Sequence, residues 1–140
     1  MSLLKVCSIA LVLALASAVS STAIAGASDP LFVNATSDDG YRATMTLTFS
    51  QRQLERKHPV TIFLSDRGVL IASKANAKKF KDQQTLLVAL MNAGASVIAC
   101  PTCMKHFGVE ETDILPGIKV GTPESIDAAL FQDNTKTLSW

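Results

Sequence analysis

Two cysteines separated by two residues are the part of this 140-residue sequence best suited to chemistry. The segment Cys100-Pro101-Thr102-Cys103 follows a short apolar run, and proline at its second position is typical of a first helical turn. Cys100 would then be the helix N-cap, where free backbone N–H groups and the helix dipole stabilise a thiolate. The spacing predicts a nucleophilic Cys100, with Cys103 on the same face and close enough to form a disulfide with it.

Two other interpretations of this pair remain open. A static disulfide or a pair of buried thiols is the structural alternative, although a bridge across so short a loop adds little stability. His106 continues the three-residue spacing, so Cys100, Cys103 and His106 could bind a soft metal such as Zn or Cu(I). His58, the only other histidine, precedes a proline at a predicted strand start and is a weak fourth ligand. We expect thiol chemistry without a bound cofactor, and the metal site is the alternative.

The segments around the cysteines alternate between strand and helix patterns, which predicts an α/β fold. Helical spacing of leucines indicates a helix over 83–92, and Thr122 followed by Pro123 indicates a second over 123–130. The predicted strands cover 31–36, 60–64, 96–99, 119–121 and 137–140. The third of these strands ends just before Cys100, and open strand ends are where α/β proteins keep their sites.

The segment Tyr41 to Phe49 has two possible structures. Its alternating threonines, preceded by Ser37-Asp38-Asp39-Gly40, fit a β-hairpin, whereas its apolar positions also fit one face of a longer helix. Two parallel strands at 31 and 60 need a crossover of about this length between them, so we predict the helix. Asp38-Asp39 would then belong to its N-terminal cap, and the later acidic cluster of Glu110, Glu111 and Asp113 to a solvated loop or helix cap.

Composition excludes several classes of function. Thirteen Lys and Arg balance twelve Asp and Glu, and no basic run exceeds two residues, which argues against binding of nucleic acid or of an anionic membrane surface. The sequence is 48% hydrophobic, which is too apolar for a disordered chain. One ordinary folded domain is therefore expected.

The first 25 residues have the pattern of a cleavable signal peptide. Lys5 precedes an apolar run over 6–19, and Ala23-Ile24-Ala25 offers small residues where a signal peptidase cuts. A transmembrane anchor is the alternative, but the run is shorter than the ~20 residues that a span needs. We predict cleavage after Ala25, which releases a periplasmic or secreted domain of residues 26–140 with no membrane attachment. That compartment permits disulfides.

The whole pattern resembles the DsrE/DsrF-like family, which includes sulfur-relay subunits of the TusD and YchN type. The segments that carry this resemblance are residues 31–34, 59–69, 92–95 and 100–104. The resemblance implies a three-layer α/β/α domain around a mainly parallel five-stranded sheet. It also implies a homo-oligomer, either a trimer or a hexamer, and it supports a helix after Gly40.

The resemblance also implies roles for the two cysteines. In the sulfur-relay members, a cysteine eight residues before a glycine carries persulfide sulfur, and here that spacing joins Cys100 to Gly108. Cys103 matches the second cysteine of the C-x-x-C branch of the family. The family would therefore make this chain a sulfur carrier or thiol redox protein that exchanges sulfur or electrons with a partner protein through Cys100 and Cys103.

Overall fold

The structure is a computed structural model that describes residue 26 and residues 28–140. The predicted signal peptide, residues 1–25, lies outside the described residues, so its cleavage stays a prediction. Among the described residues, no helix combines the length and the hydropathy that crossing a bilayer would require.

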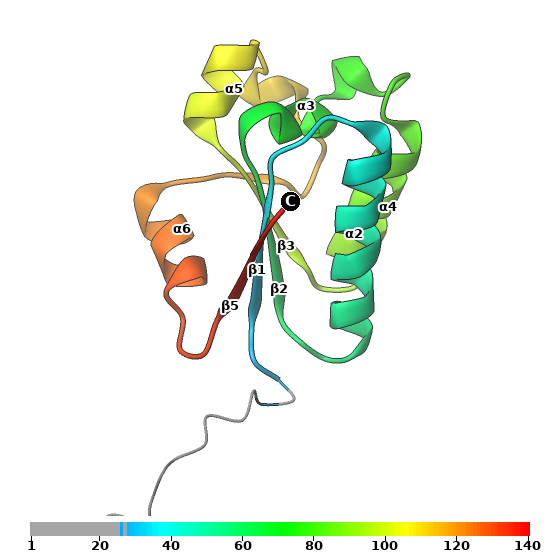
Figure 1. The fold of residues 1–140 in the computed structure, drawn as a ribbon. Helices are drawn as coiled ribbons and strands as arrows, with labels where there is room; N and C mark the ends of the chain where they lie inside the picture. The colour runs from blue at the N-terminus through cyan, green and yellow to red at the C-terminus, as the bar shows by residue number, and fades with distance from the viewer. Residues whose placement is uncertain (1–25, 27) are drawn as a thin grey trace, which may run out of the picture.

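Five strands form one parallel sheet in the order β4-β3-β2-β1-β5 (Figure 1). Leu31 of β1 lies opposite Val60 of β2 on one side and Lys136 of β5 on the other. The strands are β1 (Leu31–Ala35), β2 (Val60–Leu64), β3 (Ser96–Ala99), β4 (Lys119–Val120) and β5 (Lys136–Ser139). The predicted five-stranded α/β sheet is confirmed, and each of its pairings is parallel.

The helices make this sheet the middle of three layers. Figure 1 shows α2 (Gly40–Glu55) and α4 (Lys81–Asn92) on one face and α6 (Pro123–Leu130) on the other. Two short helices, α3 (Val69–Ala72) and α5 (Pro101–Phe107), lie at the carboxyl edge of the sheet. Three single-turn 3-10 helices complete the fold: η1 (Asp66–Gly68), η2 (Lys74–Asn76) and η3 (Glu111–Asp113).

The ambiguous segment after Gly40 is helical, as predicted. The Asp39 carboxylate caps α2 by accepting a hydrogen bond from the Arg42 N–H at 2.8 Å, which confirms its interpretation as a cap. The β-favouring threonines are accommodated because Thr46, which faces the sheet, donates its hydroxyl to the Arg42 carbonyl at 2.9 Å. Burial of Leu47 on the same face, only 1% exposed, outweighs the intrinsic strand preference of the segment.

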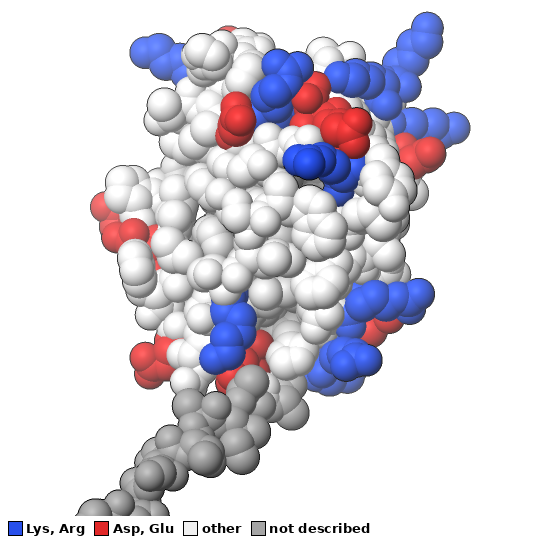
Figure 2. All heavy atoms as spheres, in the orientation of Figure 1, with Lys and Arg blue, Asp and Glu red and all other residues white. Residues whose placement is uncertain are grey.

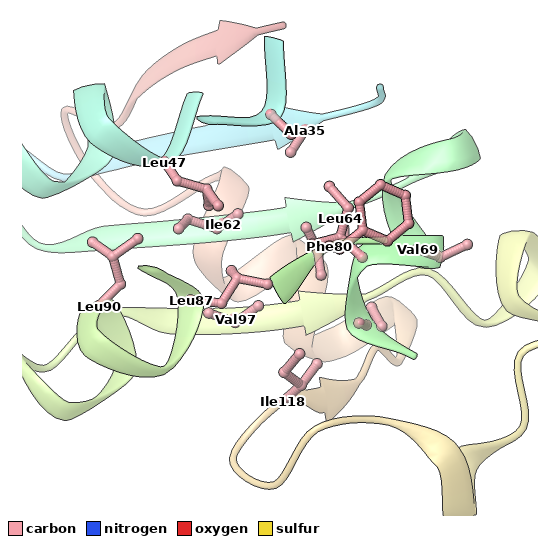
Figure 3. Packing of buried hydrophobic residues seen from close by; sticks show 14 of the residues in the cluster. Ala35, Leu47, Ile62, Leu64, Val69, Phe80, Leu87, Leu90, Val97 and Ile118 are labelled. Carbon is pink, nitrogen blue, oxygen red and sulfur yellow. The ribbon is translucent and has the colours of Figure 1, made fainter. Parts of the chain in front are cut away.

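The hydrophobic core lies between the sheet and the α2–α4 layer (Figure 3). Alternate residues of the central strand, Val60, Ile62 and Leu64, point into it, as expected for a strand with one face against helices. Leu47 and Leu87 enter it from the two helices. Close packing of these side chains fixes where each parallel strand ends, and so where the cysteines after β3 are placed.

A tight crossing joins the core to the carboxyl edge at Gly68. A Cβ atom built on Gly68 would lie 2.1 Å from the Ala35 carbonyl oxygen at the end of β1. Only glycine allows the chain after β2 to pass this close to β1.

Candidate functional site

Cys100 occupies the N-cap position predicted from the sequence. β3 ends at Ala99, and the Cys100 N–H extends the sheet pairing by donating to the Leu64 carbonyl at 2.9 Å. The backbone of Cys100 is extended, and its Sγ accepts a hydrogen bond from the Cys103 N–H at 3.2 Å. The buried side chain of Met104 anchors α5 on the core. The strand end therefore delivers Cys100 to the start of α5 with its sulfur turned towards the first helical turn.

Cys103 receives its hydrogen bond from a different part of the chain. Its Sγ accepts a hydrogen bond at 3.1 Å from the N–H of Asp66, which belongs to the turn that follows β2. Both thiols are free and half-buried. Burial raises the pKa of the Cys103 thiol, the neighbouring Cys100 sulfur adds to this, and the Asp66 N–H opposes it. Cys103 is therefore a half-buried thiol that retains its proton more readily than an ordinary cysteine, which fits a resolving role.

The turn at residues 65–68 is tied to the end of β1. Asp66 has a φ of +46°, in the left-handed region that non-glycine residues seldom adopt. The Ser65 N–H donates to the Ala35 carbonyl at 3.0 Å, and the Gly68 N–H donates to the Thr36 carbonyl at 3.1 Å. These bonds hold the Asp66 N–H at a fixed place beside Cys103. The turn lies within residues 59–69, which carry the family resemblance, but no role was predicted for it. A Ser-Asp-Arg-Gly segment directly after a buried strand is a signal for a turn.

A cluster of opposite charges fastens this edge from outside. Arg67 donates two hydrogen bonds to the Asp38 carboxylate, at 2.7 and 3.0 Å, and Lys79 donates a third at 2.9 Å. These cations hold the pKa of Asp38 well below its usual range. The Arg67 guanidinium also lies 5.6 Å from the ring centroid of Phe107 on α5. Figure 2 shows basic and acidic side chains gathered at this upper end of the molecule. Asp38 is thus an ion-pair residue rather than a helix cap.

The alternative metal site is not supported. Within the described residues, no three His, Cys, Asp or Glu side chains are arranged to hold a metal ion. The His106 ring is exposed and packs edge-on against Phe107, with 4.7 Å between ring centroids. His58 bonds to the Asp29 carbonyl at 2.8 Å, beside the start of β1 and β2 and so at the other edge of the sheet. Three-residue spacing on α5 therefore does not gather Cys100, Cys103 and His106 around one point.

The acidic cluster after Gly108 has a structural role, as predicted. Asp113 accepts a hydrogen bond from the Ser73 hydroxyl and another from the Ala75 N–H, at 3.2 Å. It thereby caps the turn that begins at Lys74. Glu110 and Glu111 are exposed.

Fold and site together define a class of protein. It is a parallel α/β domain that presents two free thiols where the inner strand β3 meets a short helix. The model of the DsrE/DsrF-like family matches residues 30–136, and the chain belongs to this family. A protein of Methanocaldococcus jannaschii called uncharacterised protein MJ0989 is 33% identical over 98 residues, which cover 69% of this chain and 86% of the relative. Uncharacterised protein MK0008 of Methanopyrus kandleri is 33% identical over 82 residues, covering 58% of this chain and 68% of the relative.

Two solved structures share the fold. The YchN protein from E. coli superposes with a TM-score of 0.60 and 14% identity, over 81% of this chain and 99% of that one. A protein of unknown function from Methanobacterium thermoautotrophicum, MTH1491, gives a TM-score of 0.67 and 12% identity, over 79% of this chain and 98% of the other. This chain therefore shares its three-layer α/β/α architecture with these two solved structures.

Proposed function

We propose that this protein is a sulfur carrier in which Cys100 holds persulfide sulfur and Cys103 resolves it. The observation that carries the proposal is the pair of half-buried thiols at the end of β3, each accepting a backbone N–H, in a DsrE/DsrF-like chain. Backbone donors aimed at sulfur favour the thiolate, which is the reactive form.

The transfer balances without any cofactor. The Cys100 thiolate attacks the outer sulfur of a donor persulfide, the donor S–S bond breaks, and its electron pair leaves on the donor thiolate. Cys100 then carries an S–SH group. An acceptor thiolate removes the outer sulfur, or the Cys103 thiolate attacks the Cys100 Sγ and releases hydrosulfide as the Cys100–Cys103 disulfide forms.

A thiol redox role would use the same two residues without sulfane sulfur, and intact mass separates the two. Protein purified under mild conditions should carry an adduct of about 32 Da on Cys100 for sulfur transfer, whereas a disulfide alone removes about 2 Da. Stoichiometric metal in the same preparation would instead restore the metal alternative and count against both thiol roles.

Single cysteine variants test the division of labour. Cys100→Ser should abolish alkylation by iodoacetamide near neutral pH and also persulfide loading. Cys103→Ser should leave Cys100 reactive and trap a lasting persulfide or mixed disulfide, because the resolving thiol is gone. Faster alkylation of Cys103 than of Cys100 would reverse the assignment, and two inert reduced thiols would favour a purely structural pair.

We also propose that the domain acts outside the cytoplasm after removal of residues 1–25. The support is the sequence pattern of Lys5, the apolar run and Ala23-Ile24-Ala25. N-terminal sequencing of the exported protein should begin at Gly26. A product that keeps Met1 would contradict this proposal and leave the thiol chemistry untouched.

Self-association into a trimer or hexamer is part of the same proposal. An apolar groove runs between α6 and the sheet, and Phe131 just after α6 is 75% exposed. The groove is lined by Phe32, Asn34, Phe63, Ile126, Leu130, Thr137, Leu138 and Ser139. Figure 2 shows few charged side chains over β5, beside this groove. Light scattering at micromolar concentration should give a multiple of the chain mass, and a monomer would contradict this part of the proposal.

A further inference from the structure

The donor that faces Cys103 belongs to a rigid turn outside the C-x-x-C segment. The Asp66 N–H points at the Cys103 Sγ from 3.1 Å, and Asp66 itself is held at a φ of +46°. Aspartate and asparagine tolerate this region better than other side chains, and β-branched residues tolerate it poorly. The turn therefore keeps an unusual backbone conformation whose visible result is an N–H aimed at sulfur.

Hydrogen bonds to the end of β1 and to the loop between β1 and α2 hold the turn at three of its residues. Ser65 and Gly68 donate their N–H groups to the carbonyls of Ala35 and Thr36, and Arg67 forms two hydrogen bonds with Asp38. A donor held in this way needs no reorganisation when negative charge develops on the sulfur. The N–H that faces Cys100, by contrast, comes from Cys103 within the same helical turn.

We propose that the Asp66 backbone N–H stabilises Cys103 as the leaving thiolate when an incoming thiolate attacks Cys100 and opens a Cys100–Cys103 disulfide. The inference rests on the proposed function, because it assigns a backbone group a part in the chemistry of the same two cysteines. Its reaction partner is a thiol, either on a protein or in a small molecule.

The step is a thiol–disulfide exchange in which electrons balance. The incoming thiolate forms a bond with the Cys100 Sγ, the Cys100–Cys103 bond breaks, and the electron pair passes to the Cys103 Sγ. The incoming sulfur is oxidised to a mixed disulfide and Cys103 is reduced. Exchange is faster when the leaving thiolate is better stabilised, so the Asp66 N–H should speed the exchange in which Cys103 leaves.

The groups that face Cys103 explain why such a donor is needed. Burial and the Cys100 sulfur both raise the pKa of the Cys103 thiol, and the Asp66 carboxylate adds to the rise. The Asp66 N–H is the contact that opposes them. The next residue of the turn, Arg67, lies over Phe107 and pairs with Asp38, which Lys79 also contacts. Cys103 would leave poorly as a thiolate without the N–H.

The first test observes the donor directly in a folded protein with one site thiol. In the Cys100→Ser variant, the amide ¹H and ¹⁵N resonances of Asp66 should shift with pH in step with the ultraviolet absorbance of the Cys103 thiolate. A second variant that also carries Cys103→Ala should lose this shift. An Asp66 amide that is unchanged while Cys103 ionises would overturn the inference.

The second test measures the exchange itself. The Cys100–Cys103 disulfide is first formed with oxidised glutathione and then opened with reduced glutathione. The reaction is quenched with iodoacetamide, and peptide mass mapping shows which cysteine carries glutathione. Native protein and Asp66→Asn, which keeps the left-handed turn, should form the mixed disulfide on Cys100. Asp66→Val, which disfavours that turn, should open about three- to tenfold more slowly and spread glutathione over both cysteines. Equal rates and equal positions in the Asn and Val variants would overturn the inference.

These outcomes are separable from failure of the proposed function. If Cys100 never carries sulfane sulfur but the Asp66 amide follows Cys103 and the exchange behaves as expected, the sulfur-carrier role fails and the leaving-thiolate assignment holds. If Cys100 loads persulfide while the Asp66 amide does not respond, the assignment alone fails. The amide titration uses the native turn, so it decides the matter even if Asp66→Val does not fold.

Discussion

The α2–α4 side of the sheet and the carboxyl edge above β1, β2 and β3 are held together by different interactions. Between the sheet and the two helices, apolar side chains form the core, with Leu47, Ile62 and Leu87 excluded from water. At the edge, backbone N–H groups meet carbonyls and sulfurs, and one carboxylate meets two cations. Hydrophobic packing determines where the strands end, and the directional bonds determine which atoms face the cysteines.

The sharpest way to separate the two regions is to damage the apolar one alone. Leu87→Ala removes a side chain with no exposure and should lower the free energy of unfolding by about 3 kcal/mol. While the protein stays folded, the alkylation rate of Cys100 should not change, because the hydrogen bonds to the two sulfurs come from Asp66 and Cys103 and none comes from α4. Urea unfolding and iodoacetamide kinetics on the same samples measure both quantities.

The adjacent residue on the same helix provides the control. Val88 is 39% exposed, and Val88→Ala should change the free energy of unfolding by no more than about 0.5 kcal/mol. A large change in Cys100 reactivity in folded Leu87→Ala would show that the two regions are coupled.

The apolar region is also the part of the molecule that the sequence predicts well. Hydrophobic spacing located β2, β3 and α4, because burial in a parallel sheet or on a helix face leaves a regular pattern. The segment from Tyr41 to Phe49 was ambiguous because its threonines favour a strand, and only the length of the crossover and the family resemblance indicated the helix. Tertiary packing, which local propensity does not include, decides that element.

Gly68 lies where the two regions meet, and a single methyl group there should disturb both. In Gly68→Ala the new Cβ would clash with the Ala35 carbonyl, so the backbone must move. We expect a loss of about 2 kcal/mol of unfolding free energy. Because the turn carries the Asp66 N–H, Cys103 alkylation should change as well, which distinguishes this variant from Leu87→Ala.

Gly40→Ala is the matched glycine control. A Cβ at Gly40 would have only an ordinary contact, 3.7 Å from the Gln83 Nε2, and the residue opens α2. The free energy of unfolding of Gly40→Ala should match that of the native protein within about 0.5 kcal/mol. Its thiol reactivity should be the same within experimental error. If Gly68→Ala also left both quantities unchanged, the close approach of the turn to β1 would not hold the site.

The site itself was predictable only in part. The pattern of Cys100, Pro101 and Cys103 after an apolar strand located the N-cap, because that is a local rule of helix starts. The contact between Asp66 and Cys103 joins residues 37 positions apart through a backbone N–H, and no side-chain type announces it. Asp38 was interpreted as a cap because its partners Arg67 and Lys79 lie 29 and 41 residues away.

The smallest effect should come from the exposed part of the edge, through Asp38. Arg67 and Lys79 lower the pKa of this carboxyl from its ordinary value of 3.8. The ionised form of Asp38 is therefore more favoured in the folded state than in the unfolded state. The resulting stabilisation is fully present above the unfolded value and is lost as pH falls through the lower folded value. Asp38→Asn should therefore lower the melting temperature by about 3 °C at pH 7, a modest shift because solvent screens the two cations.

Acid and salt should both remove this difference between native protein and Asp38→Asn. The gap in melting temperature should begin to close as pH falls below about 4, and added NaCl should narrow it at neutral pH. Glu55→Gln is the control, since it breaks a pair in which Arg52 and Glu55 are 70% and 49% exposed, and it should leave the melting temperature unchanged. A gap that persisted into strong acid would mean that the Asp38 side chain holds the turn by hydrogen bonding alone. In that case charge would have no part in keeping Arg67 over Phe107.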